Sequence, residues 1–339
     1  MTNTPINVAV IGVGAFGRNH ARVYRELEQQ GEPVRLAAVV DTTHENARRV
    51  AEEYSALAFG SIEQMLASKA QVQAASVAVP TLAHLKTAKL LLESGIDVLI
   101  EKPVATTVAE ADELIRLAEA NQRVVQVGHV ERFNPAVHAT VPLITRPMFF
   151  EVHRLSVFTP RSLDVDVVLD LMIHDLDIVL SFVNSPVKEV RAVGLAILSG
   201  KVDIANVRVE FESGCIANFT ASRVSTERVR KLRFFQAQQY ISIDYGRRDV
   251  LVFSVGGDRE GSPSANPQIA MSKPSVPDEE PLRAELKSFI QAVKTRSTPL
   301  VTLQDGRRAL ALALDITSAI HEHGKKIDVE QLQAVQRSS

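Results

Sequence analysis

The chain has 339 residues, of which 45% are hydrophobic and 23% charged, and this composition can form the cores of two domains. Its formal net charge of −2 offers no excess of positive charge for binding nucleic acid or an anionic membrane surface. The single cysteine, Cys215, excludes an internal disulfide and an all-cysteine metal cluster, and no apolar run approaches the roughly 20 residues of a membrane span. We therefore expect a cytoplasmic protein that holds no metal.

The first part of the chain alternates short apolar runs with longer amphipathic segments. These segments predict strands at 6–11, 34–40, 74–79, 97–100 and 124–127, and helices at 18–30, 45–54, 61–68, 82–94 and 108–120. Apolar strands that alternate with helices are typical of a parallel sheet covered on both faces. The predicted fold class is therefore α/β, with a dinucleotide-binding Rossmann domain over residues 1–128.

The pattern changes after residue 128 and predicts a second domain over residues 129–339. Helices are expected at 135–144, around 170–180, at 281–295 and at 304–323; strands are expected at 148–157, 187–198, 202–211, 215–221, 230–236 and 240–245. The segment 256–281 is rich in Gly, Ser and Pro and is predicted to be a long loop. Strands with little helix between them predict an α+β domain with a mostly antiparallel sheet, and we expect its terminal helix to pack back on the first domain.

A glycine-rich turn, GVGAFG, follows the first predicted strand and opens the first helix. Glycines allow a tight turn and a close approach of backbone to a pyrophosphate, and the helix N-terminus supplies unpaired N–H groups. The motif predicts a dinucleotide site, although a glycine-rich turn alone can also be structural. The residues assigned to the cofactor here are Gly12, Gly14, Ala15, Phe16 and Gly17.

Asp41 ends the second predicted strand, 24 residues after Gly17. A carboxylate at this place can bind a ribose 2′-hydroxyl and would repel a 2′-phosphate. The following residues, Thr42 to His44, include no arginine that would neutralise such a phosphate. Asp41 therefore favours NAD over NADP.

Two further segments end predicted strands, at the sheet edge where ligands bind in open parallel sheets. Glu101 and Lys102 precede Pro103, and a lysine there can transfer a proton if its surroundings lower its pKa; an exposed lysine paired with Glu101 is the alternative. Thr81 either caps the next helix or lies beside the cofactor. The cofactor residues assigned to this edge are Pro80, Thr81, His84, Glu101 and Lys102.

Four motifs in this order resemble the glucose–fructose oxidoreductase and inositol dehydrogenase family (Gfo/Idh/MocA) over nearly the whole chain. They are GVGAFG, VPTLAH at residues 79–84, EKP at 101–103, and DxxxHxxD from Asp170 to Asp177. The resemblance implies an N-terminal Rossmann domain, a C-terminal domain with a large open, mainly antiparallel sheet, and homodimers or homotetramers formed through that sheet. It also implies an NAD(P)-dependent oxidoreductase acting on a secondary hydroxyl of a sugar, cyclitol or nucleotide-linked sugar.

By this resemblance Lys102 takes part in proton transfer, and Asp170 and His174 match the carboxylate and imidazole that face it from the second domain. At about 100° per residue, Asp170, His174 and Asp177 fall on one helix face, whereas Asp175 points away and is assigned to a structural pair or to solvent. The family usually has glycine where this chain has Met172. That difference leaves the pocket shape and the helix path open.

Residues 127–136, VGHVERFNPA, together with the DLMIHDLD variant, resemble family members that act as UDP-N-acetylglucosamine 3-dehydrogenases. A diphosphate-linked sugar needs cationic or amide donors. The candidate substrate residues are Arg132, Asn134, Arg161, Asp170 and His174. Each arginine, including Arg154, can equally be a solvated surface residue.

Three other functions stay open at this point. The chain can be a dehydrogenase of a free sugar or cyclitol, a non-catalytic NAD-binding regulator, or an enzyme that oxidises a sugar transiently with tightly bound NAD. The simultaneous presence of Lys102, Asp170 and His174 argues against a regulator, which has no chemical need for all three.

Overall fold

The chain contains two separate sheets. The computed structural model describes residues 4–159, 165–256 and 268–326. Unit 1 comprises Met1–Phe133 and Glu279–Leu310, and unit 2 comprises Asn134–Asp278 and Ala311–Ser339. The expected boundary after residue 128 falls at the end of strand β6 (Val125–Gly128). A late segment of the chain thus belongs to unit 1.

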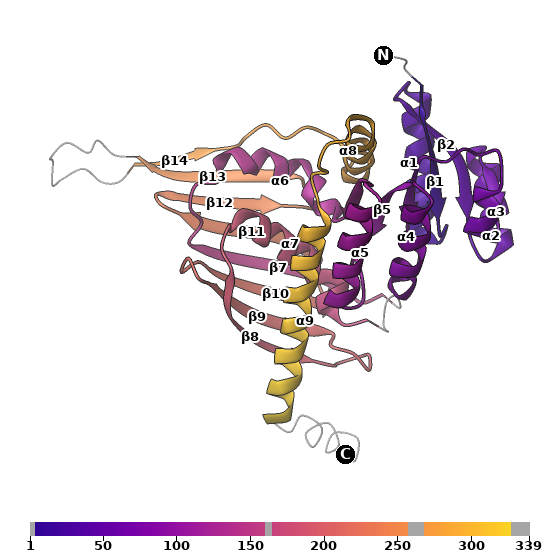
Figure 1. Cartoon of the computed structure of the whole chain (residues 1–339). Coiled ribbons are helices and arrows are strands. Elements are labelled where there is room, and N and C mark those ends of the chain that lie inside the picture. The colour runs from indigo at the N-terminus through magenta and orange to yellow at the C-terminus, as the bar shows by residue number, and fades with distance from the viewer. Residues whose placement is uncertain (1–3, 160–164, 257–267, 327–339) are drawn as a thin grey trace. The chain divides into compact units, whose positions relative to one another are not determined.

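Unit 1 is built on a six-stranded parallel sheet with the order β3-β2-β1-β4-β5-β6 (Figure 1). Its other strands are β1 (Ile6–Ile11), β2 (Val34–Val40), β3 (Leu57–Phe59), β4 (Ala74–Val77) and β5 (Asp97–Glu101). This strand order is that of the Rossmann fold, so the α/β prediction is confirmed. The three-residue β3 was not predicted, because it is too short to show an alternation of apolar residues.

Helices connect these strands, and several begin at residues suited to capping. The helices of unit 1 are α1 (Ala15–Gln29), α2 (His44–Tyr54), α3 (Ile62–Leu66), η1 (Thr81–Ala83), α4 (His84–Glu93), α5 (Val108–Ala120), η2 (Val130–Phe133) and α8 (Pro281–Thr295); α9 (Leu303–Lys326) also begins here. The Ser61 hydroxyl accepts the N–H of Gln64 before α3, and the Thr107 hydroxyl accepts the N–H of Glu110 before α5. Such caps satisfy backbone donors that a helix start leaves free.

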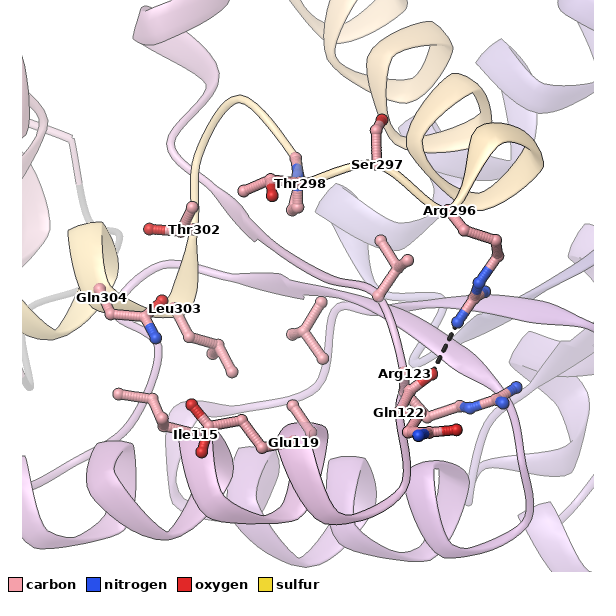
Figure 2. A pocket seen from close by; sticks show the side chains of 14 residues that line it. Ile115, Glu119, Gln122, Arg123, Arg296, Ser297, Thr298, Thr302, Leu303 and Gln304 are labelled. Carbon is pink, nitrogen blue, oxygen red and sulfur yellow. Dashed lines mark hydrogen bonds between the residues drawn. The ribbon is translucent and has the colours of Figure 1, made fainter.

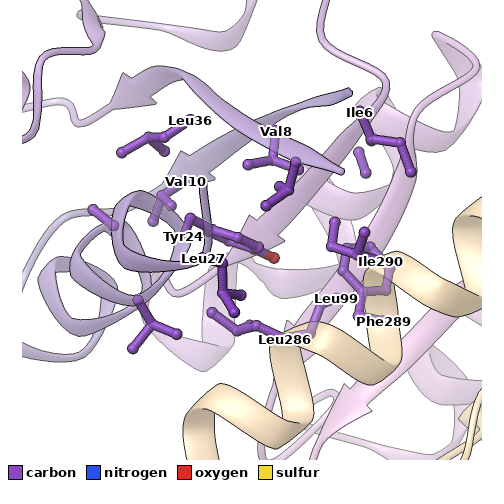
Figure 3. Close-up of a cluster of buried hydrophobic side chains, with 14 of the residues drawn as sticks. Ile6, Val8, Val10, Tyr24, Leu27, Leu36, Leu99, Leu286, Phe289 and Ile290 are labelled. Carbon is purple, nitrogen blue, oxygen red and sulfur yellow. The ribbon is translucent and has the colours of Figure 1, made fainter. Parts of the chain in front are cut away.

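The late helix α8 completes the hydrophobic core of unit 1. Figure 3 shows Leu286, Phe289 and Ile290 beside Tyr24 of α1 and Leu99 of β5, and all five side chains are buried. Burying one side chain of this size stabilises the fold by roughly 1.5–3 kcal/mol. Unit 1 is therefore a Rossmann sheet whose core needs a helix from the C-terminal part of the sequence.

Unit 2 contains an eight-stranded sheet with the order β14-β13-β12-β11-β7-β10-β9-β8 (Figure 1). The strands are β7 (Phe149–Val157), β8 (Val187–Leu195), β9 (Ile204–Phe211), β10 (Ile216–Ser225), β11 (Val229–Gln236), β12 (Gln239–Asp244), β13 (Asp249–Gly256) and β14 (Gln268–Ser272). Among the described strands of this sheet only β7 and β10 pair in parallel, so the sheet is mainly antiparallel as expected. β14 lies within the segment that was predicted to be a loop; the same segment also includes residues 257–267, which are outside the described ranges.

The helices of unit 2 differ in detail from the predicted ones. They are α6 (Pro135–Thr140), η3 (Val141–Leu143), the π-helix η4 (Val168–Met172) and α7 (Ile173–Phe182), together with the later part of α9. The predicted helix at 135–144 narrows to a 3-10 turn after Thr140. The assumption of 100° per residue does not hold over η4, because a π-helix has a wider turn. No described helix of the chain is long and apolar enough to cross a membrane.

Candidate functional site

The glycine turn of unit 1 has the geometry that a dinucleotide pyrophosphate requires. Gly12 has φ +83°, and a Cβ there would lie 2.8 Å from the Ala78 carbonyl oxygen. A Cβ on Gly17 would lie 1.8 Å from the Gly12 carbonyl oxygen, whereas one on Gly14 would meet nothing within 4 Å. Glycine at positions 12 and 17 thus allows the turn to pack closely against the backbone of Ala78 and the start of α1 to pack closely against Gly12. Gly14, which precedes α1, leaves the space through which phosphate oxygens can reach the helix N-terminus.

Asp41 is fixed beside this turn. Its Oδ2 accepts the N–H of Val13 at 2.9 Å, and its Oδ1 accepts the N–H of Thr43 at 2.8 Å. The two bonds orient the carboxylate, which can still accept ribose hydroxyls through its remaining lone pairs. Phe16 is 48% exposed at the start of α1, so the aromatic ring is accessible at the same turn.

Lys102 follows the buried end of β5 and is half-buried. Glu101 is only 7% exposed, and its Oε1 lies 3.0 Å from Nε2 of the fully buried His20 on α1. Strand register pairs Glu101 with Gly128, where a Cβ would lie 2.8 Å from Glu101 Oε1. Glycine at position 128 therefore makes the space that the Glu101 carboxyl group fills, and the alternative of an exposed Lys102–Glu101 pair does not fit a buried Glu101.

A second buried histidine, His84, contacts Pro103, the residue that follows Lys102. The ring is 1% exposed, with Nδ1 3.0 Å from the Pro103 carbonyl oxygen and Nε2 3.0 Å from the Val79 carbonyl oxygen. Burial lowers the pKa of this imidazole below its ordinary value. His84 thus joins the end of β4 to the turn after Lys102. The residues at the N-cap positions of η1 and α4 are Pro80 and Ala83, so Thr81 is not the cap of either helix, and Pro80 is exposed.

Glu285 of α8 is a second carboxyl group in this buried region. It is fully buried, and its carboxyl oxygens accept no hydrogen bond from the residues that the structure describes. Burial raises the pKa of Glu285 well above its ordinary value, and the charge of Glu101 raises it further. Burial thus favours the protonated form of the Glu285 carboxyl group, which avoids two adjacent buried carboxylates.

Glu285→Gln should make the stability of the protein less dependent on pH. The folded state holds a proton on Glu285 that the unfolded state releases above about pH 4.5, so wild-type stability falls as pH rises, by up to about 1.4 kcal/mol per pH unit until the folded pKa is reached. The neutral amide removes this loss. Melting temperatures at pH 5 and pH 8 should show an advantage of the variant that grows with pH. The exposed Glu119→Gln serves as control, and an equal advantage at both pH values would contradict a protonated Glu285.

In unit 2, the three polar residues predicted to share one helix face, the polar stripe Asp170, His174 and Asp177, differ in exposure. Asp170 and His174 are partly exposed, whereas Asp177 is 2% exposed. Met172, the last residue of the π-helix η4, is 1% exposed, so its side chain fills the interior. Asp170 and His174 are thus the members of the stripe that solvent can reach.

Asp175 forms a buried ion pair with Arg154 of β7. Arg154 Nε donates to Asp175 Oδ2 at 2.6 Å and Nη2 donates to Oδ1 at 2.9 Å, and the guanidinium lies 5.3 Å from the centre of the Tyr245 ring. Both side chains are less than 5% exposed. The structural assignment of Asp175 is confirmed, and Arg154 is an internal residue of unit 2 and not a solvated arginine.

The other candidate substrate residues have diverse surroundings. Arg132 Nη2 donates to the Leu300 carbonyl oxygen at 3.4 Å in unit 1. Asn134 is 3% exposed; its Oδ1 caps α6 and its Nδ2 donates to the Tyr245 carbonyl oxygen. Asn134 thus has a structural role at the start of α6. Arg161 lies outside the described residues.

One pocket of unit 1, of about 380 Å³, lies at the start of β6 and not at the carboxyl edge (Figure 2). Its polar rim includes Arg296, whose guanidinium donates to Asp97 and to the Gln122 carbonyl oxygen, and Arg123, which donates to the carbonyl oxygens of Asn121 and Gly95. Both guanidinium groups are thus engaged within the fold. Among the described residues, no group of three or more His, Cys, Asp or Glu side chains is placed to hold a metal ion.

Two residues of this region, His20 and Glu285, were absent from the sequence predictions. Both are polar residues on the apolar face of a helix, which is visible in the sequence pattern. His20 follows Gly17 by three positions on the buried face of α1, and Glu285 lies in line with Leu282 and Phe289 on the apolar stripe of α8. A polar residue within an apolar stripe is the signal that would have identified them.

The sequence matches two family descriptions and several full-length proteins. Residues 6–129 match "Oxidoreductase family, NAD-binding Rossmann fold", and residues 146–241 match "GFO/IDH/MocA C-terminal domain". The chain is 35% identical to UDP-N-acetylglucosamine 3-dehydrogenase of Acidithiobacillus ferrooxidans, over 93% of this chain and 97% of that protein. A solved structure of the A. ferrooxidans enzyme has a TM-score of 0.84 at 34% identity and covers 93% of this chain and 98% of the other. The chain is also 31% identical to an inositol 2-dehydrogenase/D-chiro-inositol 3-dehydrogenase of Shouchella clausii, over 55% of each.

Proposed function

Because the chain belongs to the GFO/IDH/MocA oxidoreductase family, a group of NAD-binding dehydrogenases of CH–OH groups, we propose that it oxidises a nucleotide sugar, UDP-N-acetylglucosamine, at the 3-hydroxyl. The observation that carries this proposal is the similarity to the A. ferrooxidans enzyme along nearly the whole length of both chains. The inositol dehydrogenase similarity covers about half of each chain, which makes a cyclitol the second candidate substrate.

The proposal assigns the proton chemistry to Lys102, Asp170 and His174. Oxidation of a secondary alcohol removes a hydride from carbon, which the bound nicotinamide accepts, and a proton from oxygen. His174 and Lys102 are the residues that can take this proton, and Asp170 orients or stabilises them. An imidazole suits the task with its ordinary pKa near 6.5, whereas a lysine must be shifted down from about 10.4.

NAD is the proposed cofactor, in preference to NADP. Its pyrophosphate would lie at Gly14 and the N-terminus of α1, with Asp41 at the ribose. The Asp41 carboxylate, held by the N–H groups of Val13 and Thr43, would repel a 2′-phosphate. Comparing the dissociation constants of NAD and NADP tests this choice. Arg132 and Arg161 remain the proposed partners of a substrate diphosphate.

Absorbance of NADH tests the proposed reaction. Purified protein is mixed with NAD and, separately, UDP-N-acetylglucosamine, UDP-glucose, free N-acetylglucosamine and myo-inositol. The proposal predicts NADH with UDP-N-acetylglucosamine at a kcat/KM at least about tenfold above that for the others. NADH with inositol alone would favour the cyclitol dehydrogenase. Absence of NADH with every compound, but NAD retained by the purified protein, would favour transient oxidation by bound NAD.

A ladder of cross-strand neighbours on one face of the unit 2 sheet supports a homo-oligomer. Strand register aligns Phe149, Phe235, Tyr240, Phe253 and Met271, and successive ring centres lie 5.7, 4.9 and 5.5 Å apart. Phe235 is 37% and Met271 67% exposed. An exposed apolar patch of this kind marks an association surface. We propose that a second copy of the chain covers it, in a dimer or a tetramer located in the cytoplasm, where the NAD and nucleotide-sugar pools are available.

Replacing Phe235 and Met271 together with lysine should dissociate this assembly. Two charges within a buried apolar interface are costly unless paired. Light scattering after size-exclusion chromatography should give a multiple of 37.1 kDa for wild type and one chain mass for the double variant. Leu66→Lys, an exposed apolar residue of α3 in unit 1, is the control and should keep the wild-type mass. An unchanged mass for the double variant would place the interface elsewhere.

A further inference from the structure

Buried histidines hold the residues on both sides of Lys102. His20 Nε2 lies 3.0 Å from Glu101 Oε1, and His84 Nδ1 lies 3.0 Å from the Pro103 carbonyl oxygen. The two rings are 0% and 1% exposed. The two carbonyl contacts of His84 have hydrogen-bond geometry, whereas among the described residues His20 Nε2 and Glu101 Oε1 form an ion-pair contact without a hydrogen bond. Burying polar groups is costly unless they find partners, so each of these contacts constrains the position of a residue next to Lys102.

The same histidines also reach the glycine turn. His20 lies on α1, the helix that starts directly after Gly14. His84 Nε2 lies 3.0 Å from the Val79 carbonyl oxygen, and a Cβ on Gly12 would come within 2.9 Å of the Val79 side chain. Val79 therefore packs directly against the turn. Each ring connects the expected cofactor phosphate site with the turn that carries Lys102.

We propose that His20 and His84 are positioning residues that align Lys102 with the bound cofactor, acting through Glu101 and Pro103. Neither histidine is assigned a contact with substrate. The inference rests on the proposed function in so far as that function gives Lys102 to the reacting hydroxyl. Displacing a catalytic group by about 1 Å can reduce the rate roughly a hundredfold. Contacts that fix both neighbours of Lys102 are therefore expected to have a large effect on kcat.

Amide substitutions separate the contacts of each ring. The asparagine amide nitrogen takes the place of the histidine Nδ1, and the glutamine amide nitrogen that of Nε2. A neutral imidazole can donate to only one of these two carbonyl oxygens. His84→Asn places a donor toward Pro103 and none toward Val79, whereas His84→Gln does the reverse. His20→Gln keeps a donor toward Glu101. If the histidines act through the neighbours of Lys102, the kcat lost in the alanine variants should recover in His20→Gln and His84→Asn, but not in His84→Gln.

Steady-state kinetics give the first test. His20→Ala and His84→Ala should lower kcat at least about tenfold while changing the KM for NAD less than about threefold. His20→Gln and His84→Asn should restore most of the lost kcat, and His84→Gln should not. His321→Gln, which alters an exposed histidine on α9, is the matched control. Equal recovery by the two amides at position 84 would overturn the proposal.

Acylation of lysines gives a second test that needs no substrate. The protein is labelled with a trace of acetic anhydride, and peptide mass spectrometry compares Lys102 with the exposed Lys69. The reactivity of Lys102 relative to Lys69 should change at least about threefold in both alanine variants and return in His20→Gln and His84→Asn. An unchanged ratio in folded alanine variants would overturn the proposal.

The two tests distinguish the inference from the function on which it rests. A changed ratio together with no oxidation of any sugar would refute the proposed function and leave the positioning role intact. If an alanine variant fails to fold, the comparison of His84→Asn with His84→Gln decides alone: equal Lys102 reactivity in these two variants contradicts positioning through Pro103.

Discussion

Lys102→Met should lower turnover at least about a hundredfold and leave NAD binding nearly unchanged. Proton transfer by a positioned side chain contributes roughly a hundredfold to ten-thousandfold to the rate, and methionine has similar length without a proton to exchange. The cofactor pyrophosphate and ribose are assigned to the glycine turn after β1 and to Asp41 after β2, whereas Lys102 follows β5. Turnover is measured by NADH formation and NAD affinity by calorimetry.

The exposed Lys69→Met is the control for a loss of one positive charge from unit 1. Because Lys69 is outside the described site, this variant should keep wild-type turnover and affinity. A Lys102→Met enzyme with nearly wild-type turnover would remove Lys102 from the proton-transfer step. A comparable loss of NAD affinity would instead make Lys102 a cofactor ligand.

Gly17→Ala should destabilise the protein by about 1–3 kcal/mol or more and abolish NAD binding. The added Cβ would lie 1.8 Å from the Gly12 carbonyl oxygen, which is backbone and cannot rotate away, so the turn or the helix must shift. The same shift would remove the N–H groups of the α1 start from the pyrophosphate position. Thermal unfolding and NAD titration measure the two effects.

Gly14→Ala separates the two effects, because a Cβ at this position meets no atom within 4 Å. The variant should fold with a melting temperature near that of wild type, yet bind NAD roughly tenfold or more weakly, since the methyl group occupies the approach of the pyrophosphate. If Gly17→Ala retained both stability and NAD affinity, the tight turn would have no role. Unchanged NAD affinity in Gly14→Ala would place the phosphate elsewhere.

The Rossmann part of the fold was predictable because its signals are local. β1, β2, β4, β5 and β6 are apolar runs bounded by turns, and the GxGxxG motif stands between β1 and α1. The strand β14 was missed because it pairs as an edge strand within a segment of turn-forming residues. Likewise, nothing in the spacing of residues 168–172 indicates the π-helix η4, whose last residue, Met172, is buried.

The places of the motif residues at strand ends were predictable, whereas the contacts of the residues around them were less so. Lys102 and Asp41 lie at strand ends, where pattern and topology agree. Contacts such as His20–Glu101 join residues that are 81 positions apart in the sequence, and α8 brings Glu285 from far along the chain into the Rossmann core. Such contacts depend on tertiary packing, which no short-range pattern encodes.

Hydride transfer from a labelled substrate tests the central proposal most directly. The protein is incubated with NAD, a hydrazine to trap the ketone, and UDP-N-acetylglucosamine deuterated at carbon 3, and the reduced nicotinamide is analysed by mass spectrometry. Oxidation at the 3-hydroxyl predicts reduced cofactor that is one mass unit heavier, together with a trapped ketone on the nucleotide sugar. Reduced cofactor without deuterium, or no reduction while another sugar or cyclitol is oxidised, would contradict it.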